Sequence, residues 1–266
     1  MAEAGVRTWR PPPLVKGARV RWLLIVAAGL YLAAVLGTLD VNWARLAQGG
    51  ARGARLIAGF FPPDFVTRWG DISRGVLESL WMAVAATAVG LLVSVPVALG
   101  GARNLAPRPV YLLCRGVMAF ARAFPEILVA IFFVKLFGFG TFAGFLTLVL
   151  ATVGFYAKLL AEDIEAVAPA PLEAVRAAGA GWFSWLAYAV LPQVLPRAIG
   201  LGIYRLDINF RESAVIGIVG AGGIGATLTT AMDLYDYASA AAILIIIIAI
   251  VMAAEIASGR IRRWVS

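Results

Sequence analysis

The sequence predicts an all-α integral membrane protein with six transmembrane helices. Apolar residues fill 62% of its 266 positions, and its 28 glycines are additional to that figure, whereas soluble domains are about 45–50% apolar with glycine included. Charged residues make up only 14%, against about 25% in ordinary globular chains. A helix needs about 20 apolar residues to cross the hydrocarbon core of a bilayer. Runs of suitable length lie at 21–39, 80–101, 117–138, 142–164, 195–219 and 237–258.

The six runs differ in how clearly they indicate a membrane helix. The run at 237–258 is the clearest, because it contains the sequence ILIIIIAIVMAA. The run at 21–39 is too long for a cleaved signal peptide and lacks a small-residue cleavage site, so we expect it to remain as a helix. The run at 117–138 contains Pro125, which we expect to kink the helix. The run at 195–219 is the most polar.

Positive charges in the connections predict that both termini lie in the cytoplasm. Arginines occur in the N-terminal arm, in the loop after the second run and in the C-terminal tail, as is typical of cytoplasmic segments. Segment 40–74 is the exception, since it would lie outside yet carries several arginines. Apolar residues alternate with those arginines, which predicts an amphipathic helix on the outer surface, closed by the turn at Pro62-Pro63-Asp64. A plain solvated loop is the alternative.

The whole chain is organised around the membrane. We expect a basic cytoplasmic arm at 1–20, a first transmembrane helix at 21–39, a periplasmic amphipathic segment at 40–74, a core of five transmembrane helices at 75–259 and a cytoplasmic tail at 260–266. The net charge of +8 comes from arginines that punctuate apolar runs. This pattern reports membrane topology, and we expect lipid but no nucleic acid as a partner.

The composition excludes most catalytic and cofactor chemistry. With no histidine and a single cysteine, Cys114, the chain has no imidazole base, no His-ligated metal and no internal disulfide. It contains no GxxxxGK[ST] sequence, so we expect no ATP hydrolysis and no bound cofactor on this chain. Gly220, Gly222 and Gly225 spell GxGxxG, but they follow a membrane run instead of a strand. We interpret them as helix packing or as a gate or pathway lining at the outer mouth.

The segment 169–192, between the fourth and fifth runs, predicts a short helix lying across the cytoplasmic face. Pro171 suits the first turn of such a helix, and Gly179 suits its C-terminal stop. A second amphipathic piece follows before the next span begins. An element joined in this way to two spans can transmit a conformational change from a bound soluble protein to those two membrane helices.

The same segment resembles the EAA signature of bacterial ABC importer permeases. The resemblance rests on Glu173-Ala174, with Gly179 and Leu191-Pro192 at matching distances, although Val175 stands where the family has its third-position alanine. In that family the loop binds a groove on a separate ATPase subunit, which holds ATP-Mg and drives alternating access. The resemblance implies that the coupling residues are Glu173, Ala174, Arg176, Gly179, Leu191 and Pro192.

Further segments, from about Trp43 to the C-terminus, resemble the phosphonate importer permeases. They are the turn at 62–64, the sequence RAFPE at 122–126, the sequence YRLDIN at 204–209 and the sequence GIVGAGGIG at 217–225. Methionine-type permeases share VGAGGIG, so that stretch is the least specific. The resemblance implies a type I importer permease fold in the bacterial inner membrane and a homodimer. It also implies two copies of an ATPase and a periplasmic phosphonate-binding protein as partners.

Charged residues inside the predicted spans are the candidates for a translocation pathway. A charge at mid-bilayer costs about 2.5–3.5 kcal/mol and usually avoids lipid. Oppositely charged residues four positions apart on a helix lower this cost by pairing. Pairs with that spacing are Arg122/Glu126, Lys158/Glu162 and Asp207/Arg211. Arg205 has no acid four residues away, but Asn209 and Glu212 lie near its helical face.

We hypothesise that Arg205 and Arg211 form a mildly positive passage for phosphonate oxyanions, because guanidinium groups offer planar multi-donor contacts. Internal ion pairing that fixes the fifth helix is the alternative. The pathway candidates are Arg122, Glu126, Arg205, Asp207, Asn209, Arg211, Glu212, Gly220, Gly222 and Gly225.

These features predict the permease subunit of an ATP-driven ABC importer for phosphonates or related phosphorus oxyanions, and not an enzyme. An importer for methionine or another small solute is one alternative. An integral-membrane lipid-modifying enzyme is another, and it would need an acidic cluster with a metal or base. Glu162, Asp163 and Glu165 form the only acidic cluster, and we interpret them as the cytoplasmic end of a helix.

Overall fold

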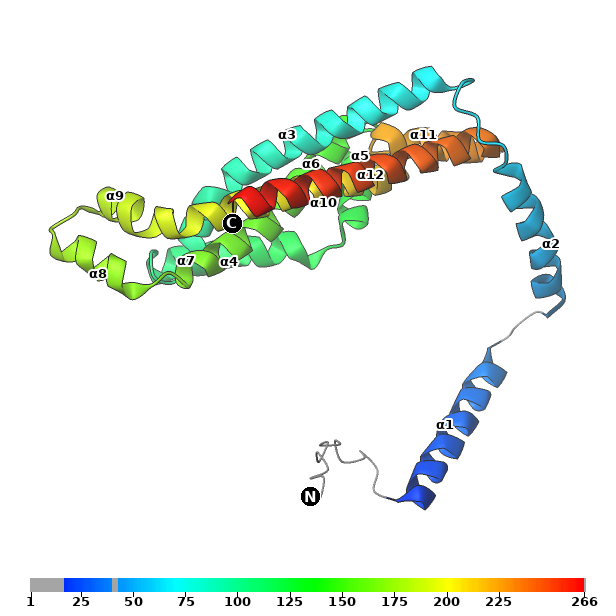
Figure 1. The fold of residues 1–266 in the computed structure, drawn as a ribbon, viewed down its shortest axis with the longest axis horizontal. Helices are drawn as coiled ribbons and strands as arrows, with labels where there is room; N and C mark the ends of the chain where they lie inside the picture. The colour runs from blue at the N-terminus through cyan, green and yellow to red at the C-terminus, as the bar shows by residue number, and fades with distance from the viewer. Residues whose placement is uncertain (1–16, 40–42, 266) are drawn as a thin grey trace, which may run out of the picture. The chain divides into compact units, whose positions relative to one another are not determined.

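The computed structural model describes residues 17–39 and 43–265, and every regular element within those ranges is helical (Figure 1). The chain divides into two compact units, 1–55 and 56–266, which are considered separately. The predicted basic arm at 1–20 lies almost entirely outside the described residues.

The first unit contains α1, Ala18–Thr38, and most of α2, Trp43–Gly59. After Arg19 and Arg21 at its start, α1 is apolar on all sides, and it has no buried residue, as expected of a helix surrounded by lipid. Its 21 residues give a length of about 32 Å, enough to cross the hydrocarbon core. α2 is strongly amphipathic, with Arg45, Arg52 and Arg55 on its polar side. Segment 43–59 is therefore helical, as predicted, while its place on the outer membrane surface stays a prediction.

The predicted turn at Pro62-Pro63-Asp64 is organised by the Asp64 carboxylate. Its Oδ1 accepts hydrogen bonds from the backbone N–H groups of Val66 (2.8 Å) and Thr67 (3.1 Å). Hydrogen bonds from the side chain and backbone of Thr67 and from the backbone of Val66 lower the pKa of Asp64. The Asp64 N–H also donates to the carbonyl of Ala238 (3.0 Å), so the turn is attached to the last helix of the bundle.

The second unit is a helical bundle built around α3, Trp69–Gly101, which packs against α6, α10 and α11. Two π-helical segments, η1 and η2, continue their neighbouring helices. The other elements are α4 Arg108–Ala123, α5 Glu126–Phe137, α6 Thr141–Thr152, η1 Val153–Ala157, α7 Lys158–Glu165, α8 Pro169–Ala177, α9 Trp182–Trp185, η2 Leu186–Val190, α10 Leu191–Gly217, α11 Gly223–Asp233 and α12 Tyr237–Val265.

The prediction of six spans is confirmed if one bent pair of helices counts as a single span. Five helices in the described residues are long and apolar enough to cross a membrane, namely Ala18–Thr38, Trp69–Gly101, Thr141–Glu165, Trp182–Gly217 and Tyr237–Ile261. The predicted span 117–138 is instead two helices, α4 and α5, bent by 90° where Phe124 and Pro125 separate them. The break follows from Pro125, which lacks an N–H donor and disfavours helical backbone in the residue before it.

Small residues line the contacts of α3 with its neighbours. Almost all its buried positions are Gly, Ala, Ser or Thr. A Cβ added at Gly75 would lie 2.6 Å from Thr227 Oγ1, and one at Gly90 would lie 2.5 Å from Thr152 Cγ2. In lipid, helices gain little from the hydrophobic effect, so association depends on such close approach. Many large apolar side chains on the outside of the bundle are exposed, for example Leu92 and Phe132.

The turn between α10 and α11 is the tightest contact in the bundle. A Cβ at Gly225 would clash with the carbonyl oxygen of Ala214, and one at Gly217 would lie 2.6 Å from the Gly222 carbonyl oxygen. Gly220 and Gly222 adopt positive φ values of 92° and 79°, which residues with a Cβ rarely adopt. The glycines of the GxGxxG sequence therefore do allow close helix packing, while their role as a gate or pathway lining stays a prediction.

We predict that Gly225→Ala destabilises the protein by about 1–3 kcal/mol, because the new methyl group overpacks the α10–α11 contact. Gly200→Ala in α10 is the matched control, since a Cβ there would meet no atom within 4 Å. The measurement is the apparent Tm of the purified protein in detergent. A Tm for Gly225→Ala equal to that of Gly200→Ala would contradict the packing role.

Candidate functional site

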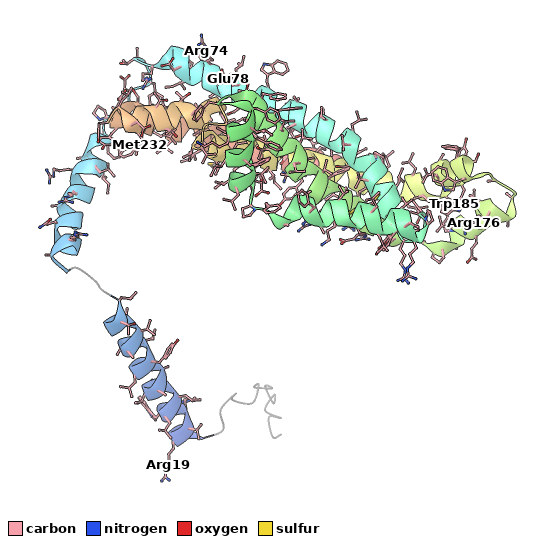
Figure 2. The ribbon with its side chains drawn as sticks, turned by 180° about the vertical axis from the view of Figure 1, so that it is seen from behind. Arg19, Arg74, Glu78, Arg176, Trp185 and Met232 are labelled. Atoms are coloured by element: carbon pink, nitrogen blue, oxygen red, sulfur yellow. The ribbon has the colours of Figure 1, made fainter. Side chains whose placement is uncertain are left out.

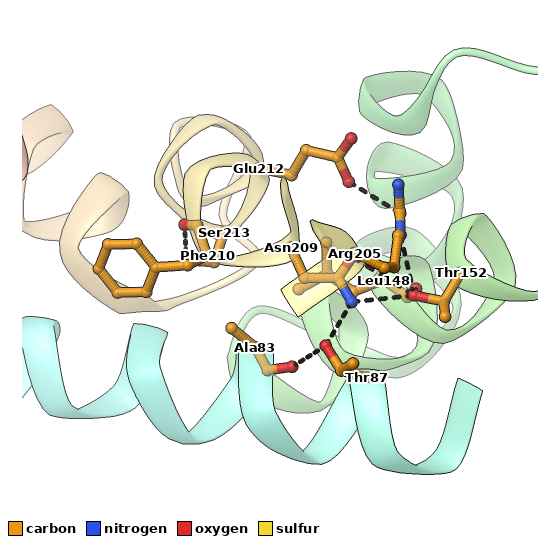
Figure 3. Close-up of polar contacts among 9 residues, drawn as sticks. All are labelled: Ala83, Thr87, Leu148, Thr152, Arg205, Asn209, Phe210, Glu212 and Ser213. Carbon is orange, nitrogen blue, oxygen red and sulfur yellow. Dashed lines mark hydrogen bonds and ion pairs between the residues drawn. The ribbon is translucent and has the colours of Figure 1, made fainter. Parts of the chain in front are cut away.

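The most deeply buried charge in the described residues is Arg205 in α10, whose side chain is only 3% exposed. Its Nε donates to Thr152 Oγ1 (3.1 Å), and its Nη2 donates to Glu212 Oε2 (3.1 Å) (Figure 3). The guanidinium also lies 5.5 Å from the centre of the Phe155 ring, a distance that allows a cation–π contact. The predicted proximity of Arg205 to Glu212 is confirmed.

Asn209 connects this arginine to two other helices. Its Nδ2 donates to Thr87 Oγ1 in α3 (2.8 Å) and to Thr152 Oγ1 at the end of α6 (2.9 Å) (Figure 3). Thr152 in turn donates to the carbonyl of Leu148 (2.6 Å). Thr152 Oγ1 therefore donates once and accepts twice, which uses its full hydrogen-bonding capacity. We call Thr87, Thr152, Arg205, Asn209 and Glu212 the arginine cluster.

A cavity of about 330 Å³ lies beside Arg205 at the break between α4 and α5. Its polar lining residues are Arg122, Glu126 and Arg205, and Phe124, Pro125 and Phe155 are among the others. Arg122 belongs to the last turn of α4 and Glu126 to the first turn of α5. Each charge thus lies at the helix end that favours it, since helix C-termini attract cations and N-termini attract anions.

The predicted helical pairing of Arg122 with Glu126 is wrong. The two residues belong to different helices, because the chain bends by 90° between them. Both residues are described, and no ion pair joins their side chains. The structure nevertheless brings both to the cavity that Arg205 lines.

Two other predicted charges of α10, Asp207 and Arg211, pair with each other and not with Arg205. Arg211 Nη2 pairs with Asp207 Oδ2 at 3.2 Å, as the four-residue spacing predicts. Asp207 is 6% exposed, whereas Arg211 is 52% exposed. Arg211 does not line the cavity beside Arg205, and the predicted passage formed by the two arginines stays a prediction. Gly220 and Gly222 lie between α10 and α11, Gly225 lies in the first turn of α11, and none of them lines the cavity at Arg205.

Each acid of the cluster at the end of α7 forms an ion pair, although Asp163 Oδ2 is buried without a hydrogen-bond partner. Glu162 pairs with Lys158 (3.8 Å), Asp163 with Arg197 (2.9 Å) and Glu165 with Arg115 (2.9 Å). Glu165 Oε1 also accepts from the backbone N–H of Arg103 (2.7 Å). This arrangement ties the end of α7 to α4, to α10 and to the loop after α3, which is a structural role.

The segment 169–192 contains the predicted short helix, α8. The helix ends in a Schellman motif: the N–H of Gly179 donates to the Arg176 carbonyl (2.9 Å), and that of Ala180 to the Val175 carbonyl (3.4 Å). Gly179 has φ +77°, the left-handed conformation that this motif requires. Glu173 and Ala174 are exposed on α8.

Trp185 attaches α8 to the helix that follows it. Its indole N–H donates to the Leu172 carbonyl (3.1 Å), and the Arg176 guanidinium lies 4.4 Å from its ring centre (Figure 2). Gln193 in α10 accepts a hydrogen bond from the N–H of Ala168, at the start of α8 (3.0 Å). α8 and α9 extend together from one end of the bundle (Figure 1), and Leu191 and Pro192 are exposed where α10 begins.

Sequence reasoning missed three residues of the site, Thr87, Thr152 and Phe155. Asn209 and Thr87 are 122 residues apart, so no local spacing indicates their contact. The available signal was composition, since hydroxyl groups inside apolar spans commonly hydrogen-bond between helices. That signal marks Thr87 and Thr152 as candidates, but it does not identify Asn209 and Arg205 as their partners.

Comparisons with known proteins agree with the fold. Residues 90–266 match the family described as the inner membrane component of binding-protein-dependent transport systems. In a search of solved structures, a chain of the inward-facing MetNI methionine ABC transporter has a TM-score of 0.64 and 24% identity, covering 73% of this chain and 96% of that one. An amino acid ABC transporter with histidines has a TM-score of 0.61 and 19% identity, covering 76% of this chain and 96% of that one. The type I importer permease fold is confirmed.

Two curated relatives are more similar in sequence. The phosphite transport system permease protein PtxC of Stutzerimonas stutzeri is 41% identical over 229 residues, covering 86% of this chain and 82% of that protein. The phosphate-import permease protein PhnE of Mycolicibacterium smegmatis is 40% identical over 202 residues, or 76% of this chain, and the match spans 38% of that protein's length. These relatives are transport permeases, as is the family matched over more than half of the chain. The chain therefore belongs to the family of inner membrane components of binding-protein-dependent transport systems.

Proposed function

We propose that this chain is the permease subunit of an ABC importer for phosphorus oxyanions, namely phosphite, phosphate or phosphonates. The observation that carries the proposal is the 41% identity to a phosphite permease over 82% of that protein's length. The arginine cluster supports it, because a buried guanidinium that lines an open cavity at the break between α4 and α5 attracts oxyanions. The methionine alternative rests on likeness of fold alone.

Within this proposal, the cavity beside Arg205 is part of the translocation pathway. Arg122 and Arg205 both line it and provide the attraction for an anion. Glu126 also lines it, and Glu212 pairs with Arg205, so the site as a whole carries no large net charge. The two guanidinium groups can bind an anion, but the nearby carboxylates keep its affinity low. A translocation pathway requires such moderate affinity, because a tightly bound substrate would not be released.

The segment 169–192 is the proposed docking site for a separate ATPase that holds ATP-Mg. Its support is local: α8 projects from the bundle, exposes Glu173 and Ala174, and is fixed to the next helix through Trp185. Movement of α8 is then passed to α10 and hence to Arg205. We further propose that both termini lie in the cytoplasm, and that two copies of this chain pair and receive substrate from a periplasmic binding protein.

The function is tested by deleting the gene that encodes this chain in its host. We predict loss of high-affinity uptake of a phosphorus oxyanion, measured with radiolabelled phosphate and with phosphite and methylphosphonate as competitors or sole phosphorus sources. Methionine uptake serves as the control and should be unchanged. Loss of methionine uptake with normal oxyanion uptake would favour the alternative substrate class.

We predict that Gly179→Ala weakens coupling to the ATPase, because alanine costs about 1–2 kcal/mol in the left-handed conformation and disturbs the end of α8. Gly181→Ala is the matched control, since Gly181 has φ −68° and a Cβ there meets no atom within 4 Å. The measurements are recovery of the ATPase with the tagged permease and the rate of ATP hydrolysis by the complex. Equal recovery and equal rates for both variants would argue against the docking role.

We predict that Arg205→Gln reduces oxyanion uptake at least tenfold, whereas Arg211→Gln changes it little. The reason is that Arg205 lines the cavity, while Arg211 does not line it, pairs with Asp207 and is half-exposed. Uptake is compared at equal amounts of monodisperse protein, so that folding defects are separated from transport defects. Similar losses in the two variants would show that the cavity is not the pathway.

A further inference from the structure

The guanidinium of Arg205 is bound to Thr152 at its Nε edge and to Glu212 at its Nη2 edge. Its Nε is bound to Thr152, whose hydroxyl is itself fixed by Leu148 and Asn209. Its Nη2 is bound to Glu212, and Nη1 forms no hydrogen bond within the described residues. An arginine has five N–H donors, so donor capacity remains free where the side chain lines the cavity.

The cavity has the chemistry of an oxyanion site. Its volume of about 330 Å³ lies within the range of roughly 300–1,000 Å³ typical of small-molecule sites. Arg122 and Arg205 line it from two different helices, and α5 begins there at Glu126. Guanidinium groups bind planar pairs of oxygens in a bidentate manner, and the N-terminal end of a broken membrane helix favours an anionic group of a substrate.

Glu212 is the group that competes with an arriving anion for the Nη2 edge of the Arg205 guanidinium. Its carboxylate already accepts from Nη2 of Arg205 at 3.1 Å. The Glu212 side chain is 24% exposed, in contrast to 3% for Arg205, so it has room to turn away while the arginine stays in place. Arg205 keeps its orientation during this exchange, because the bond from Nε to Thr152 does not involve Glu212.

We propose that a phosphorus oxyanion binds in the cavity to Arg205 and Arg122 by displacing the carboxylate of Glu212, which acts as a built-in competitor. The inference rests on the proposed function and adds a binding site with a stated exchange. Competition lowers the affinity of the site, and Glu212 returns to Arg205 when the substrate leaves. Glu212 thereby promotes release as well as limiting binding.

The test is oxyanion binding to the purified complex of permease and ATPase, without the periplasmic binding protein. Radiolabelled inorganic phosphate is the probe in equilibrium dialysis, with phosphite and methylphosphonate as competitors. Glu212→Gln should lower the Kd at least tenfold, about the effect of removing one charged competitor, and should reduce the maximal rate of uptake. Arg205→Gln should abolish binding, and Arg122→Gln should weaken it.

Glu162→Gln is the matched control, because Glu162 pairs with Lys158 and lines no part of the cavity. Glu212→Asp keeps the charge with a shorter reach and should give an intermediate Kd, which covers the case in which the glutamine variant does not fold. An unchanged or higher Kd in the folded Glu212 variants would overturn the proposal. Such a Kd together with normal uptake of phosphorus oxyanions by the wild type would refute the displacement of Glu212 and leave the proposed function intact. A wild type that takes up no phosphorus oxyanion would refute the proposed function itself.

Discussion

A guanidinium group inside a membrane bundle must find its partners within that bundle, and Arg205 imposes this requirement on the rest of the structure. A charge at the centre of a span costs about 2.5–3.5 kcal/mol, and an unpartnered buried charge is unfavourable in any apolar medium. Thr152 and Glu212 bind Arg205 directly, while Asn209 joins Thr152 to Thr87. Because these residues come from α3, α6 and α10, the positions of the three helices are fixed relative to one another.

The small residues of the bundle serve the same requirement. Asn209 reaches both hydroxyl groups only because α3 approaches the end of α6 at Gly90, where a Cβ would lie 2.5 Å from Thr152 Cγ2. Gly154 allows a similar approach of α4, since its Cβ would lie 2.9 Å from Arg122 Cγ. Without these two glycines the threonines could not bind the asparagine, and Arg122 could not come as close to the segment that carries Phe155.

Features that depend on neighbouring residues could be predicted from the sequence, and features that depend on distant contacts could not. The bounds of α8 follow from a proline at its start and Gly179 after its end, and the pairing of Asp207 with Arg211 follows from helical spacing. The 90° break at Pro125 lies in a run that is apolar apart from Arg122, Glu126 and Lys135, and a proline in such a run does not distinguish a kink from a full turn. The contact of Asn209 with Thr87 depends on which helices become neighbours, which hydropathy does not reveal.

The helix that runs from Trp182 to Gly217 is longer than a membrane is thick. Its 36 residues extend for about 54 Å, whereas the hydrocarbon core measures about 30 Å. The helix is therefore about 20 Å longer than the core is thick, and the excess requires a tilt, an extension into the headgroup region and beyond, or both. An extension at the N-terminal end of this helix would place Trp182 and Phe183, which are 49% and 80% exposed, beyond the acyl chains, where they can contact another protein.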